Sequence, residues 1–173
     1  DILNYIASKE GWQLDYVPST WEKNLEKLAK AEIDLLLDIA KSESRAELFD
    51  FNTESVFSNW AIVYVQKNSQ IQSILDLRGK KIAAMKGDIS YEGFRRNIKN
   101  LGIYSTFEPV DNFSDIFELI AQEKADAGII SRLYGLHLRV KYNVTRSTII
   151  CCPENLYFAV PRKKNQELIQ KID

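Results

Sequence analysis

The chain has 173 residues, of which 45% are hydrophobic and 27% are charged, and its net charge is -1. This length is sufficient for one good hydrophobic core or two small ones. The near-zero net charge, with lysine and arginine spread along the chain, argues against nucleic acid or an anionic membrane surface as the main partner. No run of apolar residues approaches the length of a membrane span.

The N-terminal stretch predicts a helix over residues 1–10. Apolar residues recur at helical spacing in "ILNYIA", and Gly11 follows as a stop signal. The sequence therefore opens inside a helical pattern, and we expect further residues upstream of it.

Alternating strands and helices follow in the first part of the chain. After an expected strand at 13–17, a helix is predicted over Trp21–Lys30, whose apolar side chains share one face. The wholly apolar run Ile33–Leu37 is typical of a buried parallel strand. Further strands are expected at Phe49–Asn52 and Trp60–Val65.

A second series of alternating elements begins with Ile71–Leu77. Its expected strands are Ile82–Met85, Thr106–Val110 and Ala125–Ile130. Three helices are expected: one that follows Ser90 and ends at Asn100, one over Phe113–Gln122 and one over Ser131–Val140. The C-terminal part adds strands at Ser147–Cys151 and Leu156–Val160 and a helix at Asn165–Ile172. This alternation predicts an α/β fold with mainly parallel sheets flanked by helices. Because the series occurs twice, two small lobes fit better than one sheet.

The two cysteines, Cys151 and Cys152, are adjacent, and the only histidine is His137. A disulfide between neighbouring residues is strained, and these three side chains cannot supply the four ligands of a structural zinc site. We therefore interpret both cysteines as small apolar residues on a strand, and we expect neither a metal nor another cofactor.

Polar loops follow three of the predicted strands at their carboxyl ends, where α/β folds bind ligands. The first loop covers residues 38–45, the second covers residues 86–91, and the third contains Ser131 and Arg132. In the second loop, Gly87 permits a ligand to approach the backbone closely. The helix that follows offers free N–H groups to an anion. If the two lobes face one another, the three loops converge on one cleft.

Four stretches together resemble the type II periplasmic solute-binding proteins of family 3, the amino-acid-binding branch. They are "STWEKNLEKLAKAEIDLLLDIAKSESRAELFDFN", "SNWAIVYVQKNSQIQSILDLRGKKIAAMKGDISYEGF", "DNFSDIFELIAQEKADAGIISRLYG" and "LYFAVPRKKNQELIQKID". Within that family, the chain is most similar to the solute-binding-like sensor domains of bacterial histidine kinases. The resemblance implies a first lobe of residues 1–67 and 151–173, an inserted second lobe of residues 68–150, and a missing first strand that should precede Asp1.

The resemblance also implies a role for Arg45. The stretch Ser42-Glu43-Ser44-Arg45 matches a Thr/Ser-x-x-Arg turn with which amino-acid-binding relatives hold the α-carboxylate of the ligand. A planar guanidinium suits a carboxylate because the two groups form paired, charge-assisted hydrogen bonds. The alternative interpretation is that Arg45 is a solvated loop charge.

Three positions depart from the pattern of the family. Ser131 stands where relatives usually have the aspartate that holds the amino group of the ligand, and Ala40 stands where a hydroxyl residue is common. Asp88 follows Gly87 where relatives have a Gly-Thr pair, and it would repel an anion. Asp38 or Asp88 could replace the missing acid. We therefore expect carboxylates or other organic anions to bind better than zwitterionic amino acids.

The remaining candidate ligand contacts lie next to these positions. They are Trp21, Trp60, Lys86, Ile89, Tyr91 and Arg132. Trp21 also fits a core position at the start of an amphipathic helix, and Lys86 also fits a solvated charge. Trp60 and Tyr91 fit cleft lining and packing equally well.

Catalytic motifs are missing from the sequence. The single histidine, His137, lies in a predicted helix beside Leu136 and Leu138 and cannot anchor a Ser/His/Asp arrangement. No phosphate-binding Gly-rich motif occurs. The enzyme alternative is the cyclohexadienyl or arogenate dehydratase group of the same fold, which would need Asp38 or Asp88 as general acid.

We expect the chain to be the periplasmic or extracellular ligand-sensing domain of a membrane signalling protein of the histidine kinase type. It would bind a small anionic or amino-acid-like solute in the interlobe cleft. The rest of the protein would connect it to the membrane, and the full-length sensor could form a homodimer. The alternative is the solute-binding component of an ABC transporter for amino acids or organic acids. A membrane span and a kinase after residue 173 would favour the sensor.

Overall fold

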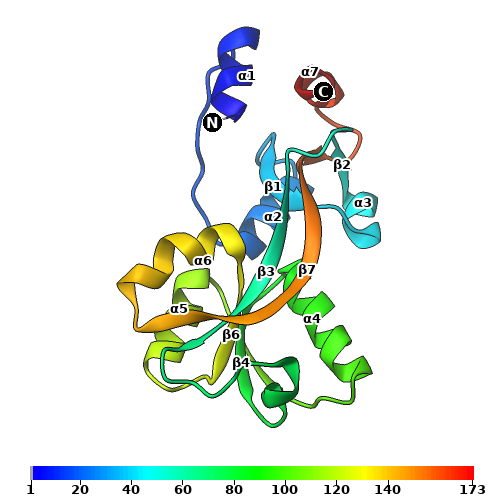
Figure 1. Ribbon diagram of the computed structural model, residues 1–173. Helices are drawn as coiled ribbons and strands as arrows, with labels where there is room; N and C mark the ends of the chain where they lie inside the picture. The colour runs from blue at the N-terminus through cyan, green and yellow to red at the C-terminus, as the bar shows by residue number, and fades with distance from the viewer. Residues whose placement is uncertain (1) are drawn as a thin grey trace. The chain divides into compact units, whose positions relative to one another are not determined.

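The computed structural model describes residues 2–173, and the chain divides into two compact units (Figure 1). Unit 1 consists of Asp1–Phe57 and Asn155–Asp173, and unit 2 consists of Ser58–Glu154. The divisions fall inside two long strands, β3 (Phe57–Gln66) and β7 (Val144–Pro161). The boundaries expected from the sequence are after residues 67 and 150.

The sheet of unit 1 has the C-terminal part of β7 at its centre. β1 (Leu36–Ala40) and β2 (Phe49–Phe51) both pair with β7 in the antiparallel sense. Ala159 of β7 lies opposite a residue of β1 on one side and a residue of β2 on the other. The expectation of mainly parallel pairing is therefore wrong for this unit, because the last strand of the chain runs back between β1 and β2.

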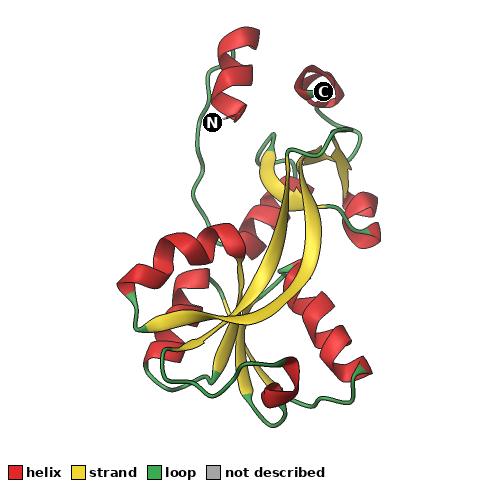
Figure 2. Ribbon diagram, in the orientation of Figure 1, coloured by secondary structure: helices red, strands yellow, loops and turns green. Residues whose placement is uncertain are grey.

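Helices cover both faces of this sheet (Figure 2). On one face, α2 (Trp21–Ala29) buries Leu28 in a cluster with residues of β1, β2 and β7. On the other face, α1 (Ile2–Glu10) and α7 (Gln166–Ile172) surround Phe158 and Val160 of β7. Successive side chains of β7 point to opposite faces of the sheet. The core of unit 1 is therefore divided between two helical layers.

Two expectations about the first forty residues need correction. Residues 13–17 are irregular instead of forming a strand, and most of them are exposed. A strand needs a neighbour for its N–H and C=O groups, and no strand in the described part of the chain pairs with them. The strand expected at Ile33–Leu37 is displaced towards the C-terminus, so Asp38 and Ala40 belong to β1 and not to a loop after it.

The sheet of unit 2 is mixed. Its strands are arranged in the order β3-β6-β4-β5, where β4 is Lys81–Met85, β5 is Thr106–Val110 and β6 is Ala127–Ser131. β4 is parallel to both β5 and β6, as expected for a βα series. β3 is antiparallel to β6. The chain as a whole is therefore a mixed α/β protein.

The core of unit 2 also lies on both faces of its sheet. α4 (Ile89–Asn100) buries Phe94 and Ile98 against inward-facing residues of β3, β4 and β6. On the opposite face, α5 (Phe113–Ala121) places Phe117 5.3 Å from the ring of Tyr64. α6 (Arg132–Leu138), followed by the short η2 (Arg139–Lys141), packs over the same tyrosine through Gly135.

Two further elements complete the description of the fold. Ile71–Leu77 contains the short 3-10 helix η1 (Ile74–Leu77), because Asp76 accepts hydrogen bonds from the backbone N–H groups of Gln72 and Ser73. These bonds lower the pKa of the Asp76 carboxyl. The two strands expected near the C-terminus are one continuous strand, β7.

We expect Gly128→Ala to destabilise unit 2 by roughly 1–3 kcal/mol, because a buried helix would have to move to make room. A methyl group at this position of β6 would lie 2.1 Å from Cγ2 of Ile116 in α5. The control is Gly93→Ala in α4, where the added methyl approaches only the Cys152 Sγ at 3.3 Å and the higher helix propensity of alanine favours the fold. Urea unfolding measures both, and equal midpoints for wild type and Gly128→Ala would contradict this packing.

Candidate functional site

The candidate residues fall into two groups, one in each unit. Unit 1 holds Trp21, Asp38, Ala40, Ser42 and Arg45. Unit 2 holds Trp60, Lys86, Gly87, Asp88, Ile89, Tyr91, Ser131 and Arg132. Each group contains an arginine next to a tryptophan ring.

Arg45 is positioned by a short helix that immediately follows β1. The structure forms α3 (Glu43–Leu48) where a polar turn was expected. Ser42 is its N-cap, with extended backbone angles and an Oγ that accepts a hydrogen bond from the Arg45 backbone N–H at 3.2 Å. The polar segment between β1 and β2 is therefore a helix start, and the observed contact of Ser42 is the cap.

The side chain of Arg45 is buried, with only 9% of its surface exposed. Its Nη1 donates a hydrogen bond to the carbonyl oxygen of Ala40 at 2.8 Å. The guanidinium carbon lies 5.6 Å from the ring centroid of Trp21, which also packs on the α2 cluster. These contacts contradict the interpretation of Arg45 as a solvated loop charge, because a buried cation requires compensating partners.

Asp38 and Ala40 contribute in different ways to this part of β1. Asp38 has a φ of 56° and sits where the register of β1 against β7 is irregular. The irregularity turns its side chain outwards and leaves it exposed, yet desolvation by the surrounding protein raises the pKa of its carboxyl. Ala40 is buried, and its carbonyl oxygen, not its side chain, meets Arg45.

In unit 2, the loop before α4 is closed by its own side chains. Gly87 has a φ of 69°, which suits glycine, and Asp88 is the N-cap of α4. The Asp88 Oδ1 accepts a hydrogen bond from the Ser90 backbone N–H at 3.1 Å. A carboxylate of the protein thus occupies an N–H group that the sequence assigned to a ligand anion. Lys86 forms a 2.9 Å ion pair with Asp111.

Tyr91 and Ile89 lie on the first turn of α4. The Tyr91 ring packs on the core of unit 2, with its centroid 5.3 Å from that of Phe107. Ile89 is half-buried. Tyr91 was interpreted as either cleft lining or packing, and its described contacts are those of packing.

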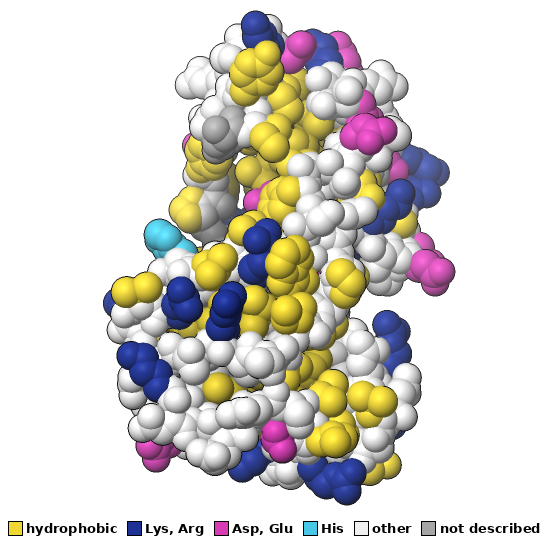
Figure 3. Space-filling view, viewed as in Figure 1, with side chains coloured by type: hydrophobic (Ala, Val, Ile, Leu, Met, Phe, Trp, Pro, Cys, Tyr) yellow, Lys and Arg dark blue, Asp and Glu magenta, His cyan; other side chains and the backbone are white. Residues whose placement is uncertain are grey.

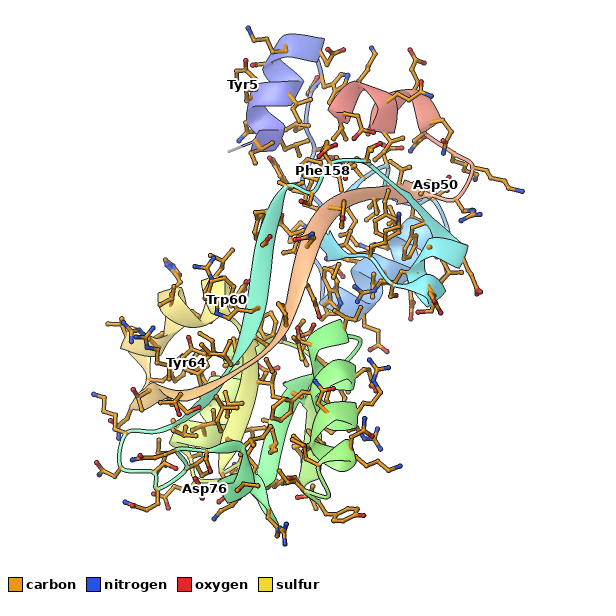
Figure 4. All side chains as sticks on the ribbon, turned by 45° about the vertical axis from the view of Figure 1, so that its right-hand side comes forward. Tyr5, Asp50, Trp60, Tyr64, Asp76 and Phe158 are labelled. Carbon is orange, nitrogen blue, oxygen red and sulfur yellow. The ribbon has the colours of Figure 1, made fainter. Side chains whose placement is uncertain are left out.

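The ends of β3 and β6 bring four polar side chains of unit 2 together. The antiparallel register places Ala61 opposite Ser131, so that the residues before Ala61 lie beside the start of α6. Asn59 Nδ2 donates a hydrogen bond to the Ser131 Oγ at 2.9 Å. The guanidinium carbon of Arg132 lies 4.0 Å from the ring centroid of Trp60, which is labelled on β3 in Figure 4.

Asn59 was not among the site residues predicted from the sequence. It is 7% exposed, and its Oδ1 has no hydrogen-bond partner among the residues that the structure describes. The Nε1 of Trp60 and the Nε of Arg132 are likewise buried, with no hydrogen-bond partner within residues 2–173. The only signal for Asn59 was a polar residue directly before a long apolar strand, which also fits a loop. We call Asn59, Trp60, Ser131 and Arg132 the β3–β6 cluster.

Cys151 and Cys152 are half-buried, free thiols that pack on the core of unit 2, which agrees with their interpretation as small apolar residues. Cys152 has a φ of 53°, and its Sγ donates a hydrogen bond to the Ser90 carbonyl oxygen at 3.4 Å. A hydrogen bond between the two thiols raises the pKa of Cys151 and lowers that of Cys152.

Within residues 2–173, no group of three or more His, Cys, Asp or Glu side chains is arranged to hold a metal ion. The same residues contain no helix with the length and apolarity needed to cross a membrane.

The entire chain, residues 1–173, matches the model of the bacterial extracellular solute-binding proteins, family 3. The chain belongs to this family. The resemblance found in the sequence is thereby confirmed, and so is its α/β fold class. The homologues of this family 3 chain are solute-binding proteins, not enzymes.

Two curated relatives of the family 3 chain are the L-cystine-binding protein TcyJ of Escherichia coli K12 and the arginine-binding extracellular protein ArtP of Bacillus subtilis. TcyJ is 25% identical over 147 residues, which are 84% of this chain and 54% of TcyJ. ArtP is 26% identical over 131 residues, which are 75% of this chain and 50% of ArtP. The chain therefore spans about half the length of these relatives.

Solved structures of similar fold include an ancestral arginine-binding protein bound to arginine, with a TM-score of 0.85 and 25% identity over 99% of this chain and 77% of that one. A histidine kinase sensor domain with similarity to periplasmic binding proteins has a TM-score of 0.84. It is 20% identical over 99% of this chain and 74% of its own, so it supports the fold alone.

Ser42→Ala should lower the free energy of unfolding by roughly 0.5–2 kcal/mol, because α3 loses its N-cap. Ser42→Asp restores a capping oxygen and should recover most of this loss. Ser44→Ala is the matched control, since it removes a neighbouring hydroxyl and leaves the bond from the Arg45 N–H to Ser42 intact. Denaturant unfolding without added solute measures all three, and an unaffected Ser42→Ala would contradict the capping role.

Proposed function

We propose that this domain binds a small solute through a carboxylate held by Arg45, and that it is the extracytoplasmic ligand-sensing part of a membrane signalling protein. The observation that carries the proposal is the buried guanidinium of Arg45, fixed at the start of α3. A planar guanidinium and a carboxylate match in shape, because they form two parallel, charge-assisted hydrogen bonds.

The local structure supports this role in two ways. The bond from Arg45 Nη1 to the Ala40 carbonyl oxygen and the ring of Trp21 fix the orientation of the guanidinium before any solute arrives. Pre-organisation of this kind reduces the conformational entropy lost on binding. Two relatives are named as binding L-cystine and arginine, and both of these solutes carry a carboxylate.

The solute is proposed to be a simple carboxylate or another organic anion. Ser131 stands at the position where the resemblance predicts an acid for the amino group, and its Oγ is engaged by Asn59. Asp88, one of the two substitutes considered for that acid, caps α4 through its carboxylate. Asp38, the other substitute, lies in the irregular part of β1, where desolvation raises the pKa of its carboxyl.

The second candidate function is the solute-binding component of an amino-acid or organic-acid transporter. One similar structure, with a TM-score of 0.84, is the substrate binding protein of an amino acid ABC transporter, but its 20% identity supports the fold alone. The two functions differ in the gene beyond residue 173. A membrane span followed by a kinase would support the sensor, and a stop codon would support the transporter.

Arg45→Ala should weaken binding of a carboxylate solute by roughly 2–5 kcal/mol, because the partner charge loses its bidentate contact. Arg162→Ala is the control: it removes an arginine of the same unit that pairs with Asp50 at 3.6 Å on the surface. Arg45→Lys keeps the charge and loses the planar fork, so its loss should be intermediate. Titration calorimetry with equal affinities for Arg45→Ala and wild type would contradict the assignment.

A thermal-shift panel tests the solute class. A solute at about one hundred times its dissociation constant adds about 2.7 kcal/mol of stability. We expect organic anions to give larger shifts of the unfolding midpoint than the twenty standard amino acids, because the ammonium contact of the family is not reproduced. The largest shift coming from a zwitterionic amino acid would overturn this expectation and leave the binding function itself in place.

A further inference from the structure

The outer side of α6 and η2 in unit 2 exposes a stripe of apolar side chains. Leu133, Leu136 and Val140 follow one another at helical spacing, so they lie on one side of the segment. Their exposed fractions are 44%, 39% and 84%. The other side of α6 packs on the core, where Gly135 is buried against Tyr64. Single exposed apolar residues are ordinary, but a continuous apolar stripe indicates an interaction surface.

Basic side chains flank this stripe. Arg139 and Lys141 belong to η2, and Arg146 belongs to β7. Burial raises the pKa of Tyr64, whereas the charges of Arg139 and Arg146 lower it, so both guanidinium groups lie near this one side chain. Figure 3 shows dark-blue basic side chains beside hydrophobic ones in the region of the chain's single histidine, which belongs to α6.

The name α6–η2 face is used below for these apolar and basic residues together. They are Leu133, Leu136, Arg139, Val140, Lys141 and Arg146. Arg132 belongs to the β3–β6 cluster and is not included.

Acidic side chains do not compensate the charges of the α6–η2 face. Between Asp126 and Glu154 the sequence contains no aspartate or glutamate. Within residues 2–173, none of the three cations forms an ion pair. The helix beside α6 is α5, whose acids are Asp115 and Glu118, and Asp115 accepts hydrogen bonds from Asn112 at the start of α5. The face is therefore positive, although the net charge of the chain is -1.

We infer that the α6–η2 face docks onto an anionic phospholipid surface. The three cations lie at the level of the lipid phosphates, and the apolar stripe enters the boundary between headgroups and acyl chains. The inference goes beyond the proposed function, because none of these residues belongs to the proposed solute site.

The combination of charge and apolarity on one face selects this occupant. Nucleic acid would satisfy the cations through its phosphates but would leave the apolar stripe exposed to water. A second copy of the same face would bring like charges together, which is unfavourable. A lipid surface offers phosphates and acyl chains side by side. The net charge argues against an anionic membrane as the main partner of the whole chain, whereas the α6–η2 face restricts such a contact to one side of unit 2.

Flotation with unilamellar vesicles tests the docking. Vesicles of phosphatidylglycerol and phosphatidylcholine in equal parts are anionic, and vesicles of phosphatidylcholine alone are the neutral reference. The wild-type domain should bind the anionic vesicles about tenfold more tightly or better, because each Lys or Arg near an anionic surface contributes about fivefold. High salt should reduce this preference, since exposed charges are screened.

Charge and apolarity are tested by separate variants. Lys141→Gln combined with Arg146→Gln removes two charges from the face and should weaken binding to the anionic vesicles about tenfold or more. Arg95→Gln combined with Arg96→Gln is the matched control, because it removes the same charge from exposed positions of α4, on the opposite face of the sheet, and should leave binding unchanged. Val140→Asn keeps every charge and should weaken binding several-fold, because an apolar side chain no longer enters the bilayer.

All five positions are exposed, so the variants should fold as the wild type does, which circular dichroism checks. No binding to the anionic vesicles, as expected if an acidic protein covers the face instead, would overturn the inference. Equal binding to both kinds of vesicle, or equal losses in the face and control variants, would overturn it too. An unaffected Val140→Asn would do the same, because the contact would then be electrostatic alone. The proposed function stands or fails separately, by titration of a carboxylate solute into wild type and Arg45→Ala.

Discussion

The burial of the Arg45 charge is the constraint on which the functional account depends. A guanidinium that is 9% exposed is held by the Ala40 carbonyl oxygen and lies near the ring of Trp21. The irregular register of β1, the cap at Ser42 and the start of α3 all serve to place this side chain. Stability alone would favour an apolar residue here, because buried ionic contacts rarely repay their desolvation. The proposed function gives this charge a role, as the contact for the carboxylate of a solute.

Unit 2 also places a guanidinium beside a tryptophan ring, but it does so with different elements. Arg132 stacks on Trp60 at 4.0 Å, and the antiparallel register of β3 and β6 brings Asn59 to Ser131. In both units an aromatic ring restrains a guanidinium, so that little rotamer entropy remains to be lost on binding. The loop before α4, in contrast, is satisfied internally by the Asp88 cap and by the Lys86–Asp111 ion pair. In unit 2, positive charge is therefore offered by a side chain more than by the N-terminus of α4.

The fold class and most helices could be predicted from the sequence, because the apolar periodicity of segments such as Trp21–Ala29 and Phe113–Ala121 is strong. Strand pairing could not: β7 lies between β1 and β2, and the partners of a strand are long-range and leave no local signal. The displacement of β1 and the formation of α3 escaped prediction because a β-bulge and an N-cap act over two or three residues. Arg45 was identified by the resemblance, whereas Asn59 became visible only from its contact with Ser131.

The central claim is that Arg45 holds a carboxylate of the solute, and NMR of the arginine side-chain ¹⁵Nε resonances tests it most directly. Arg45→Lys assigns the Arg45 signal in the ¹⁵N-labelled domain. During titration with succinate or glutarate, this resonance should shift and reach saturation at the solute concentration at which calorimetry shows the site to be full, because both report a single binding event. An unchanged Arg45 signal in the presence of bound solute would contradict the account.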